Sequence, residues 1–178
     1  MIIIPGFLIA LATFPGVIVH EAAHLFFCKL RRVAVFDVCY FRLGNPAGYV
    51  LHERTNNFTS SFLIAVGPFL INSLLCILFC VPAFVPVKLF NQSDPASYFL
   101  IWLGISIGMH AFPSMQDAKV LRQEAKAAAG SLNPLAILSF PLVIAIYGAN
   151  LGRVFWLDYF YGIALGFLLP EMLLRQLA

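Results

Sequence analysis

Five long apolar stretches set the strongest limit on how this chain can fold. They lie at about residues 2–28, 61–87, 97–113, 133–149 and 154–174. A helix needs about 20 apolar residues to cross a bilayer. Only 11% of the 178 residues are charged, whereas soluble domains carry roughly 25%, so too little charge remains to cover a water-exposed surface. We therefore expect an all-α polytopic membrane protein with about five transmembrane helices.

Lysine and arginine residues gather in the connections that follow the first and third apolar stretches. They are Lys29, Arg31, Arg32, Arg42, Arg54, Lys119, Arg122 and Lys126, and Arg175 follows the last stretch. Only Lys88 and Arg153 fall on the opposite side. Because cytoplasmic loops carry an excess of these residues, we expect a multi-pass protein of the cell membrane with its N-terminus outside and its C-terminus in the cytoplasm. The net charge of +3 reflects this orientation, and no basic patch with interleaved aromatic residues predicts a nucleic-acid partner.

The end of the first apolar stretch carries a His-Glu-Ala-Ala-His motif at residues 20–24. On a helix, residues four positions apart lie on one face, so His20 and His24 can bind one Zn²⁺ ion. Zinc lowers the pKa of a bound water molecule towards about 7, and Glu21 can take its proton as general base during attack on a peptide carbonyl. Ionisable groups at membrane depth are costly and are therefore functional candidates. The pattern predicts peptide hydrolysis with one Zn²⁺ per chain.

A catalytic zinc site needs a third protein ligand and keeps one position for water. Asp117 is the best candidate, because it lies just beyond the third apolar stretch, on the side that His20 and His24 also approach. Its other interpretation is a charge at the membrane surface. His110 is the alternative metal ligand. It lies about two helical turns before Asp117, and Pro113 between these two residues should distort the helix and could redirect either side chain. The other interpretation of His110 is a buried imidazole that is hydrogen-bonded to a neighbour.

Three stretches of the chain resemble the site-2 protease family of intramembrane zinc metalloproteases. Residues 17–27 carry the His-Glu-Ala-Ala-His motif within a helix. Residues 65–72 are similar to the family's Gly-Pro-x-x-x-Asn-like signature in the helix beside the zinc. Residues 113–117 lie where the family supplies its aspartate ligand within a Leu-Asp-Gly motif, although Gln116 and Ala118 flank the aspartate here.

The resemblance covers about residues 14–120 and implies a fold, an activity and a substrate class. The resemblance implies a catalytic core at about 1–125 within one expected membrane-embedded domain over residues 1–178, whose extra helices at about 133–174 lie outside the likeness. It further implies cleavage of peptide bonds in or near the transmembrane segments of protein or peptide substrates, close to the cytoplasmic side of the bilayer. In this family likeness Asn72 helps to bind the substrate or the reacting carbonyl, while a hydrogen bond between helices is its other interpretation.

Residues 33–54, between the first two apolar stretches, contain two runs rich in Val, Phe and Tyr around a turn at 44–48. This pattern predicts a small membrane-associated β-hairpin. A protease must hold its substrate extended, and an exposed strand edge can bind an extended peptide by strand addition. The hairpin could equally cap the helix bundle, and both interpretations stay open.

Two other functions, and one other type of membrane zinc protease, are compatible with the same residues. A membrane metal carrier would also place His and Asp in helices, but it would need a polar path across the bilayer, and the last two stretches supply little beyond Glu171. A catalytically silent scaffold would keep the fold but would have no need for Glu21. In another type of membrane zinc protease, Glu124 or Glu171 would replace Asp117 as the third ligand. No oligomeric state is indicated.

Overall fold

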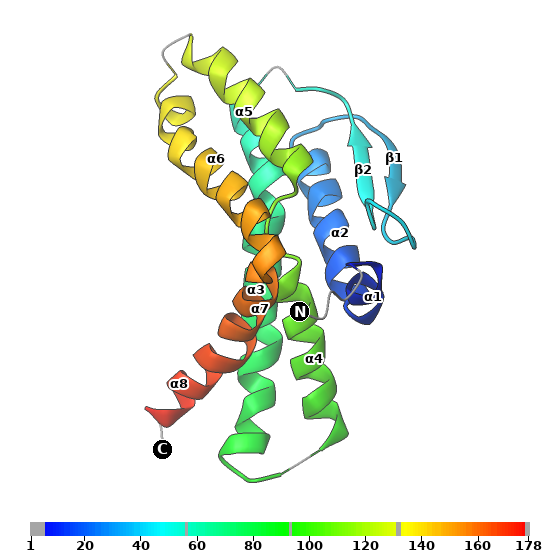
Figure 1. Ribbon diagram of the computed structural model, residues 1–178, viewed down its shortest axis with the longest axis vertical. Helices are drawn as coiled ribbons and strands as arrows, with labels where there is room; N and C mark the ends of the chain where they lie inside the picture. The colour runs from blue at the N-terminus through cyan, green and yellow to red at the C-terminus, as the bar shows by residue number, and fades with distance from the viewer. Residues whose placement is uncertain (1–5, 56, 93, 131–132, 177–178) are drawn as a thin grey trace.

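One long helix, α3, runs along most of the long axis of the molecule (Figure 1). The computed structural model describes residues 6–55, 57–92, 94–130 and 133–176. Helix α3 spans Phe58–Lys88, and its first turn is capped by the Asn57 side chain, which accepts a hydrogen bond from the Ser60 amide at 3.2 Å. Three prolines lie inside α3, at positions 68, 82 and 86. Because proline has no backbone N–H, each leaves one carbonyl of the preceding turn without its helical partner.

The first apolar stretch forms two helices instead of one. Helix α1 spans Gly6–Ala12, helix α2 spans Phe14–Leu30, and the break lies at Thr13. A proline lies in the first turn of α2, where a missing N–H is tolerated. Helix α2 packs closely against α3, and a side chain at Gly67 would collide with the ring of Phe27. The glycine therefore allows the two helices to approach.

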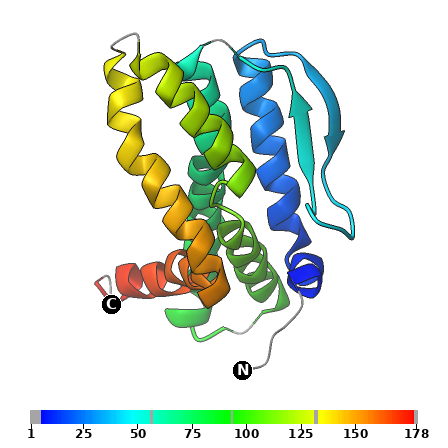
Figure 2. The ribbon, with the colours of Figure 1, turned by 45° about the horizontal axis from the view of Figure 1, so that its top comes forward.

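The predicted hairpin between the first two apolar stretches is present. Strand β1 spans Val35–Cys39 and strand β2 spans Tyr49–His52, and the two pair antiparallel with Cys39 opposite Tyr49. The hairpin packs against α2. In Figures 1 and 2, β2 lies between β1 and α2, so the edge of β2 that is not paired with β1 faces the helices.

Three further helices complete the part of the fold that surrounds α2 and α3. Helix α4 (Pro95–Met109) returns beside the second half of α3, while α5 (Met115–Ala129) and α6 (Pro134–Gly152) pack as a pair beside its first half. Small side chains on α5 allow this close packing. The buried cluster consists of Phe58, Ala65, Val66, Ala118, Leu121, Ala125, Ala136, Val143 and Ile146. The hairpin lies on one side of α2, and α5 and α6 lie on the other (Figure 2).

The C-terminal part of the chain bends back towards α3 and α4. It consists of η1 (Arg153–Phe155), α7 (Leu157–Ile163), the π-helical segment η2 (Ala164–Leu168) and α8 (Leu169–Arg175). The bend lies at Trp156, which has a φ of 63°. At Gly162 an added Cβ would lie only 2.7 Å from Met109 of α4, so the glycine permits the close contact of α7 with α4.

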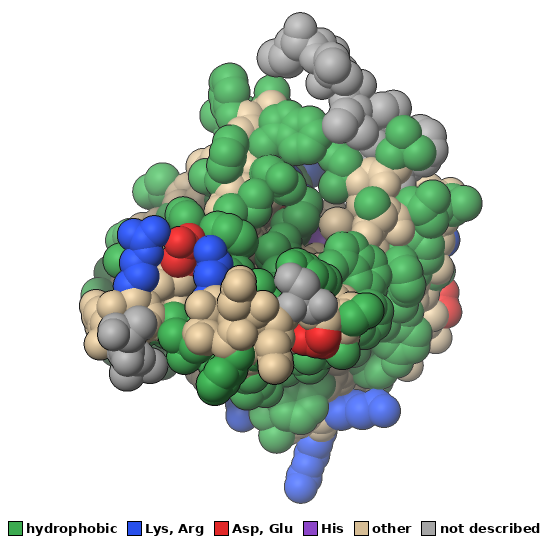
Figure 3. Space-filling model, turned by 90° about the horizontal axis from the view of Figure 1, so that it is seen from below, with side chains coloured by type: hydrophobic (Ala, Val, Ile, Leu, Met, Phe, Trp, Pro, Cys, Tyr) green, Lys and Arg blue, Asp and Glu red, His purple; other side chains and the backbone are tan. Residues whose placement is uncertain are grey.

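Three helical segments among the described residues are long and apolar enough to cross a membrane. They are Phe58–Lys88, Pro134–Phe155 and Leu157–Arg175. Helix α4 is also apolar but has 15 residues, or about 22 Å of length, which is less than the roughly 30 Å of a bilayer core. Five transmembrane helices therefore remain a prediction, because the first apolar stretch is divided and the third is short. Large hydrophobic side chains are exposed along the helices, among them Phe26 of α2, Leu74 of α3 and Ile144 of α6, which fits a bilayer environment. Hydrophobic side chains also cover much of the lower end of the molecule, with charged side chains among them (Figure 3).

Candidate metal centre

Helix α2 brings His20, Glu21 and His24 into the interior of the molecule. Their exposed fractions are 9%, 8% and 7%. The two histidines lie one turn apart on the same helical face, and their Nε2 atoms are 3.1 Å from each other. The expected common face of the motif is therefore observed.

Asp117 approaches the two histidines from the first turn of α5. Ser114 caps this helix: its Oγ accepts a hydrogen bond from the Asp117 amide at 3.1 Å, and the Asp117 carboxylate accepts one from the Ser114 amide at 2.7 Å. The same carboxylate oxygen, Oδ2, lies 3.6 Å from His24 Nε2. One ligand atom from each of His20, His24 and Asp117 lies within 4.8 Å of the other two. The structure thus brings together the three residues proposed from the sequence as metal ligands.

Two backbone carbonyls fix the orientation of the histidine rings. His20 Nδ1 lies 2.7 Å from the His110 carbonyl oxygen, and His24 Nδ1 lies 2.9 Å from the Ile64 carbonyl oxygen. A carbonyl can only accept a hydrogen bond, so each Nδ1 must carry the hydrogen and each neutral ring presents a free lone pair at Nε2. Metal-bound histidines typically donate their other ring nitrogen in this way.

The two Nε2 lone pairs and the Asp117 carboxylate therefore face one another. Three electron-rich groups at this distance repel unless a proton or a cation lies among them. Two ligands bound tetrahedrally to zinc at about 2.1 Å would lie about 3.4 Å apart, which compares with the observed 3.1 and 3.6 Å. Burial raises the pKa of Asp117, but its interactions with His24, His20 and Ser114 together lower it more, so the pKa lies well below its ordinary value. The donor set, two imidazoles and a carboxylate, fits a catalytic zinc ion.

The Ile64 carbonyl is free to accept from His24 because of a proline one turn later. In a regular helix this carbonyl would accept a hydrogen bond from the amide of residue 68. Residue 68 is proline, which has no N–H. The Gly-Pro pair of the family-like signature therefore has two physical roles: Gly67 admits helix α2, and Pro68 leaves the Ile64 carbonyl available to His24.

Glu21 lies beneath the hairpin. A Cβ at Gly48, the residue before β2, would lie 2.7 Å from Glu21 Cγ and 3.0 Å from the Tyr40 carbonyl oxygen. Only a residue without a side chain fits between the hairpin and Glu21. The carboxylate that we expect to act as general base is therefore confined by the same segment that leads into β2.

Asn72 is fully buried and its amide nitrogen faces three backbone carbonyls. The Nδ2 atom lies 3.1 Å from both the Ile107 and the His110 carbonyl oxygens and 3.4 Å from that of Gly16. The His110 carbonyl thus accepts from both His20 and Asn72. Asn72 Oδ1 has no hydrogen bond within the described residues. The amide links α3 to α2 and to the end of α4, and a contact with substrate stays a prediction.

The alternative ligands lie away from the cluster. The His110 ring is turned towards Thr13, with Nε2 2.8 Å from the threonine hydroxyl, so His110 contributes its carbonyl and not its imidazole. Glu124 forms an ion pair with Arg54 at 2.8 Å. Glu171 pairs with Arg175 at 2.9 Å and with Lys88 at 3.7 Å. None of these three side chains belongs to the metal-sized group that the structure describes.

The groups that support the ligands were not among the residues predicted from the sequence. Ser114 could have been found, because a serine followed three residues later by an acidic residue is a helix-capping pattern. The carbonyls of His110 and Ile64 could not, since every residue has one. Comparison of the chain with protein-family models, curated proteins and solved structures finds no match. The likeness to site-2 proteases therefore depends on the three sequence stretches.

Proposed function

We propose that this chain is a zinc-dependent intramembrane endopeptidase of the site-2 protease type. The observation that supports this most strongly is the convergence of two imidazole lone pairs and one carboxylate beside a buried glutamate. Its substrates would be membrane proteins or peptides, cut in or near a transmembrane segment. His20, His24 and Asp117 would hold the zinc, which leaves the fourth position of a tetrahedral site for water.

Each site residue has a separate task in this reaction. When bound, zinc supplies Lewis acidity, which makes water more acidic and polarises the peptide carbonyl. Glu21 accepts a proton on its carboxylate as the water oxygen forms a bond to the carbonyl carbon, and it returns that proton to the leaving amide nitrogen as the C–N bond breaks. His20 and His24 each donate the Nδ1 hydrogen to a backbone carbonyl, which leaves Nε2 of each ring to hold the zinc. The burial of all three residues limits competing water.

The hairpin is suited to present the substrate. Helical peptide bonds are protected by their own hydrogen bonds, so a substrate must be extended before it is cut. The unpaired edge of β2 faces α2 (Figure 1), and the residue before β2 contacts Glu21. If the hairpin moves away from α2, a substrate segment that adds to this edge as a third strand would lie close to Glu21.

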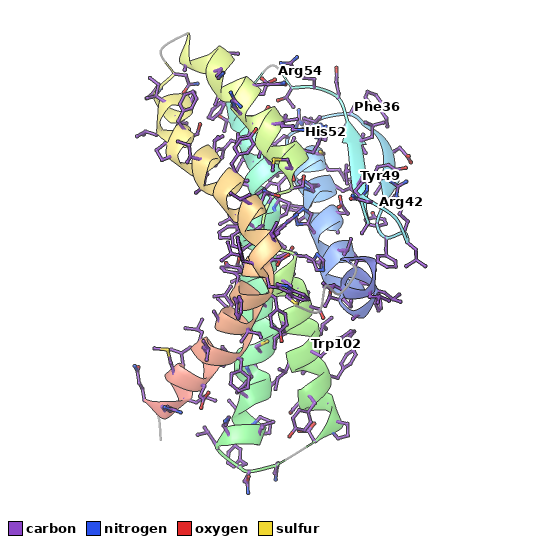
Figure 4. The ribbon with its side chains drawn as sticks, viewed as in Figure 1. Phe36, Arg42, Tyr49, His52, Arg54 and Trp102 are labelled. Atoms are coloured by element: carbon purple, nitrogen blue, oxygen red, sulfur yellow. The ribbon has the colours of Figure 1, made fainter. Side chains whose placement is uncertain are left out.

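The orientation in the membrane follows from the distribution of positive charge. Arg54 lies at the end of the molecule where α3 begins (Figure 4), and the connections after α2 and α5 meet at the same end (Figure 1). Seven of the expected cytoplasmic Lys and Arg residues belong to the last turn of α2, to these connections or to α5. They are Lys29, Arg31, Arg32, Arg54, Lys119, Arg122 and Lys126. We infer that this end faces the cytoplasm and that cleavage occurs near that side.

The two rival functions have less support. A metal carrier would need a succession of polar groups across the bilayer, and among the described residues one group of metal-ligating side chains gathers. A silent scaffold would have no use for Glu21, which is costly to bury beside the metal ligands. The buried Glu21 favours an enzyme.

The test combines metal content with cleavage of a model transmembrane substrate by the detergent-purified protein. One zinc per chain should be bound by the unchanged protein and by Glu21→Gln, which should no longer cleave. His24→Ala and Asp117→Ala should lose the zinc. Glu53→Gln, the same change at an exposed position, should bind and cleave normally. The absence of zinc from the unchanged protein would overturn the proposal, and normal zinc binding by Asp117→Ala would move the third ligand to another residue.

A further inference from the structure

A short connector between α4 and α5, His110–Ser114, contacts two of the three proposed metal ligands, His20 and Asp117. At its start, the His110 carbonyl accepts the hydrogen bond from His20 Nδ1 at 2.7 Å. At its end, Ser114 caps α5 and exchanges two hydrogen bonds with Asp117. Any displacement of this connector therefore moves the orientation of His20 and the position of Asp117 together.

The middle of the connector is held by the end of α6. Asn150 Nδ2 donates to the Pro113 carbonyl at 3.0 Å, and Arg153 donates to the Phe112 carbonyl at 3.1 Å. Pro113 is buried, so water cannot readily replace Asn150 there. These two contacts join consecutive carbonyls of the connector to residues about 40 positions later in the chain.

Asn150 is not needed to form the helix that carries it. Helix α6 is strongly apolar, and an amide at such depth is costly unless it finds partners. Asn150 donates to Ile146 of its own helix at 2.9 Å and to Pro113. A leucine at this position would continue the helix better, so the contact with the connector is the reason that the structure offers for an asparagine.

The aromatic contacts of the connector bury it, but its hydrogen bonds determine where its carbonyls point. The ring of Phe112 packs against Tyr161 and Phe69, with ring centroids 4.8 and 5.7 Å apart. Such contacts bury the side chain but do not fix where the neighbouring carbonyls point. Directional hydrogen bonds from Asn150 and Arg153 do fix them.

We propose that Asn150 and Arg153 are positioning residues that set the geometry of the metal site through the connector. The proposal rests on the zinc site of the proposed function. Neither residue touches the ligand cluster, and both act on carbonyls between the groups that orient His20 and hold Asp117. The helices beyond the family-like core thereby become part of the metal site.

Zinc affinity, measured by competition with a chelator, tests this role. Asn150→Leu should bind zinc about 10- to 100-fold more weakly, the usual effect of removing a group that supports a ligand. Arg153→Ala should weaken binding less, because its side chain is 39% exposed, and Arg153→Lys should recover part of the loss. Leu151→Ala, at a 70% exposed position between them, is the matched control and should bind normally.

A double-mutant cycle separates positioning from general destabilisation. If Asn150 acts through the Ser114 cap that holds Asp117, Asn150→Leu should cost little further zinc affinity when Ser114→Ala is already present. A purely structural role would give the same fold-loss in both backgrounds and would overturn the proposal. Thermal unfolding of the metal-free proteins shows whether each variant is folded, and Arg153→Ala gives a second route if Asn150→Leu is not.

The outcomes also distinguish this proposal from the proposed function. Normal zinc affinity in both Asn150→Leu and Arg153→Ala, with zinc present in the unchanged protein, would overturn the positioning role alone. An unchanged protein that binds no zinc would overturn both.

Discussion

Replacing Pro68 with alanine should stabilise the metal-free protein and yet weaken zinc binding. The new amide N–H would complete the helical hydrogen bond to the Ile64 carbonyl, which is the partner of His24 Nδ1 at 2.9 Å. A proline inside a helix costs about 3 kcal/mol relative to alanine. The smaller side chain would lose about 1–2 kcal/mol of packing, since Pro68 is among the fully buried side chains. A net gain of about 1–2 kcal/mol is therefore expected for folding.

The expected loss of zinc affinity in Pro68→Ala also arises at the Ile64 carbonyl. A carbonyl oxygen has two lone pairs, so His24 would share it with the new amide and not lose it altogether. We therefore expect the lower end of the usual range, about a tenfold loss of zinc affinity, or about 1.4 kcal/mol. Chelator competition measures the affinity, and thermal unfolding of the metal-free protein measures the stability.

Pro82→Ala is the matched control for this experiment. It lies in the same helix, well over three turns further from the cluster, and should gain helical stability with normal zinc affinity. Unchanged zinc affinity in a folded Pro68→Ala protein would refute the idea that the proline frees the carbonyl for His24. An equal loss in both variants would point to a general effect of straightening α3.

Three further predictions test the hairpin, the helix cap and the orientation. Gly48→Ala should keep its zinc but cleave about 10- to 100-fold more slowly, because the new methyl group would lie 2.7 Å from Cγ of Glu21, the proposed general base. Gly44→Ala, whose nearest neighbour is 3.7 Å away, should cleave normally, and equal rates in the two variants would contradict the confinement of Glu21. Ser114→Ala should cost about 1 kcal/mol in thermal unfolding and also weaken zinc binding, whereas loss of stability with full zinc affinity would show that the cap does not hold the aspartate ligand. A membrane-impermeant thiol reagent should label Gln92→Cys from outside the cell and Arg54→Cys only after the cytoplasm is opened, and labelling of both from one side would rule out the proposed orientation.

Local patterns predicted the hairpin well. Residues rich in Val, Phe and Tyr around Gly44–Gly48 became β1 and β2 with the turn between them. The number of spans was harder to predict, because hydropathy does not register where a helix stops. The break at Thr13 and the early end of α4 at Met109 lie inside continuous apolar stretches. Helix breaks of this kind depend on tertiary contacts, such as the hydrogen bond from Trp102 to the Ala12 carbonyl at 3.2 Å.

The ligand side chains were accessible to prediction because residue type and helical spacing specify them. His20 and His24 share a face on any helix. Asp117 was predicted because it lies at the same expected membrane depth as the two histidines. The side-chain partners of Glu124 and His110 could not be predicted in this way. Each is decided by a partner at a sequence distance of 70 or 97 residues, Arg54 and Thr13 respectively. Such pairings follow only from the packed fold.

The histidines of this site are oriented by main-chain atoms, and this has a consequence for how the protein can diverge. The carbonyl of residue 64 or 110 is present whatever side chain stands there. Substitutions at these two positions can accumulate while the ring orientation is retained, provided that the helix geometry is kept. The residues that must persist are those that shape the backbone, such as the proline at 68. Related chains would then keep the site with little sequence in common beyond the ligands and their helix breakers.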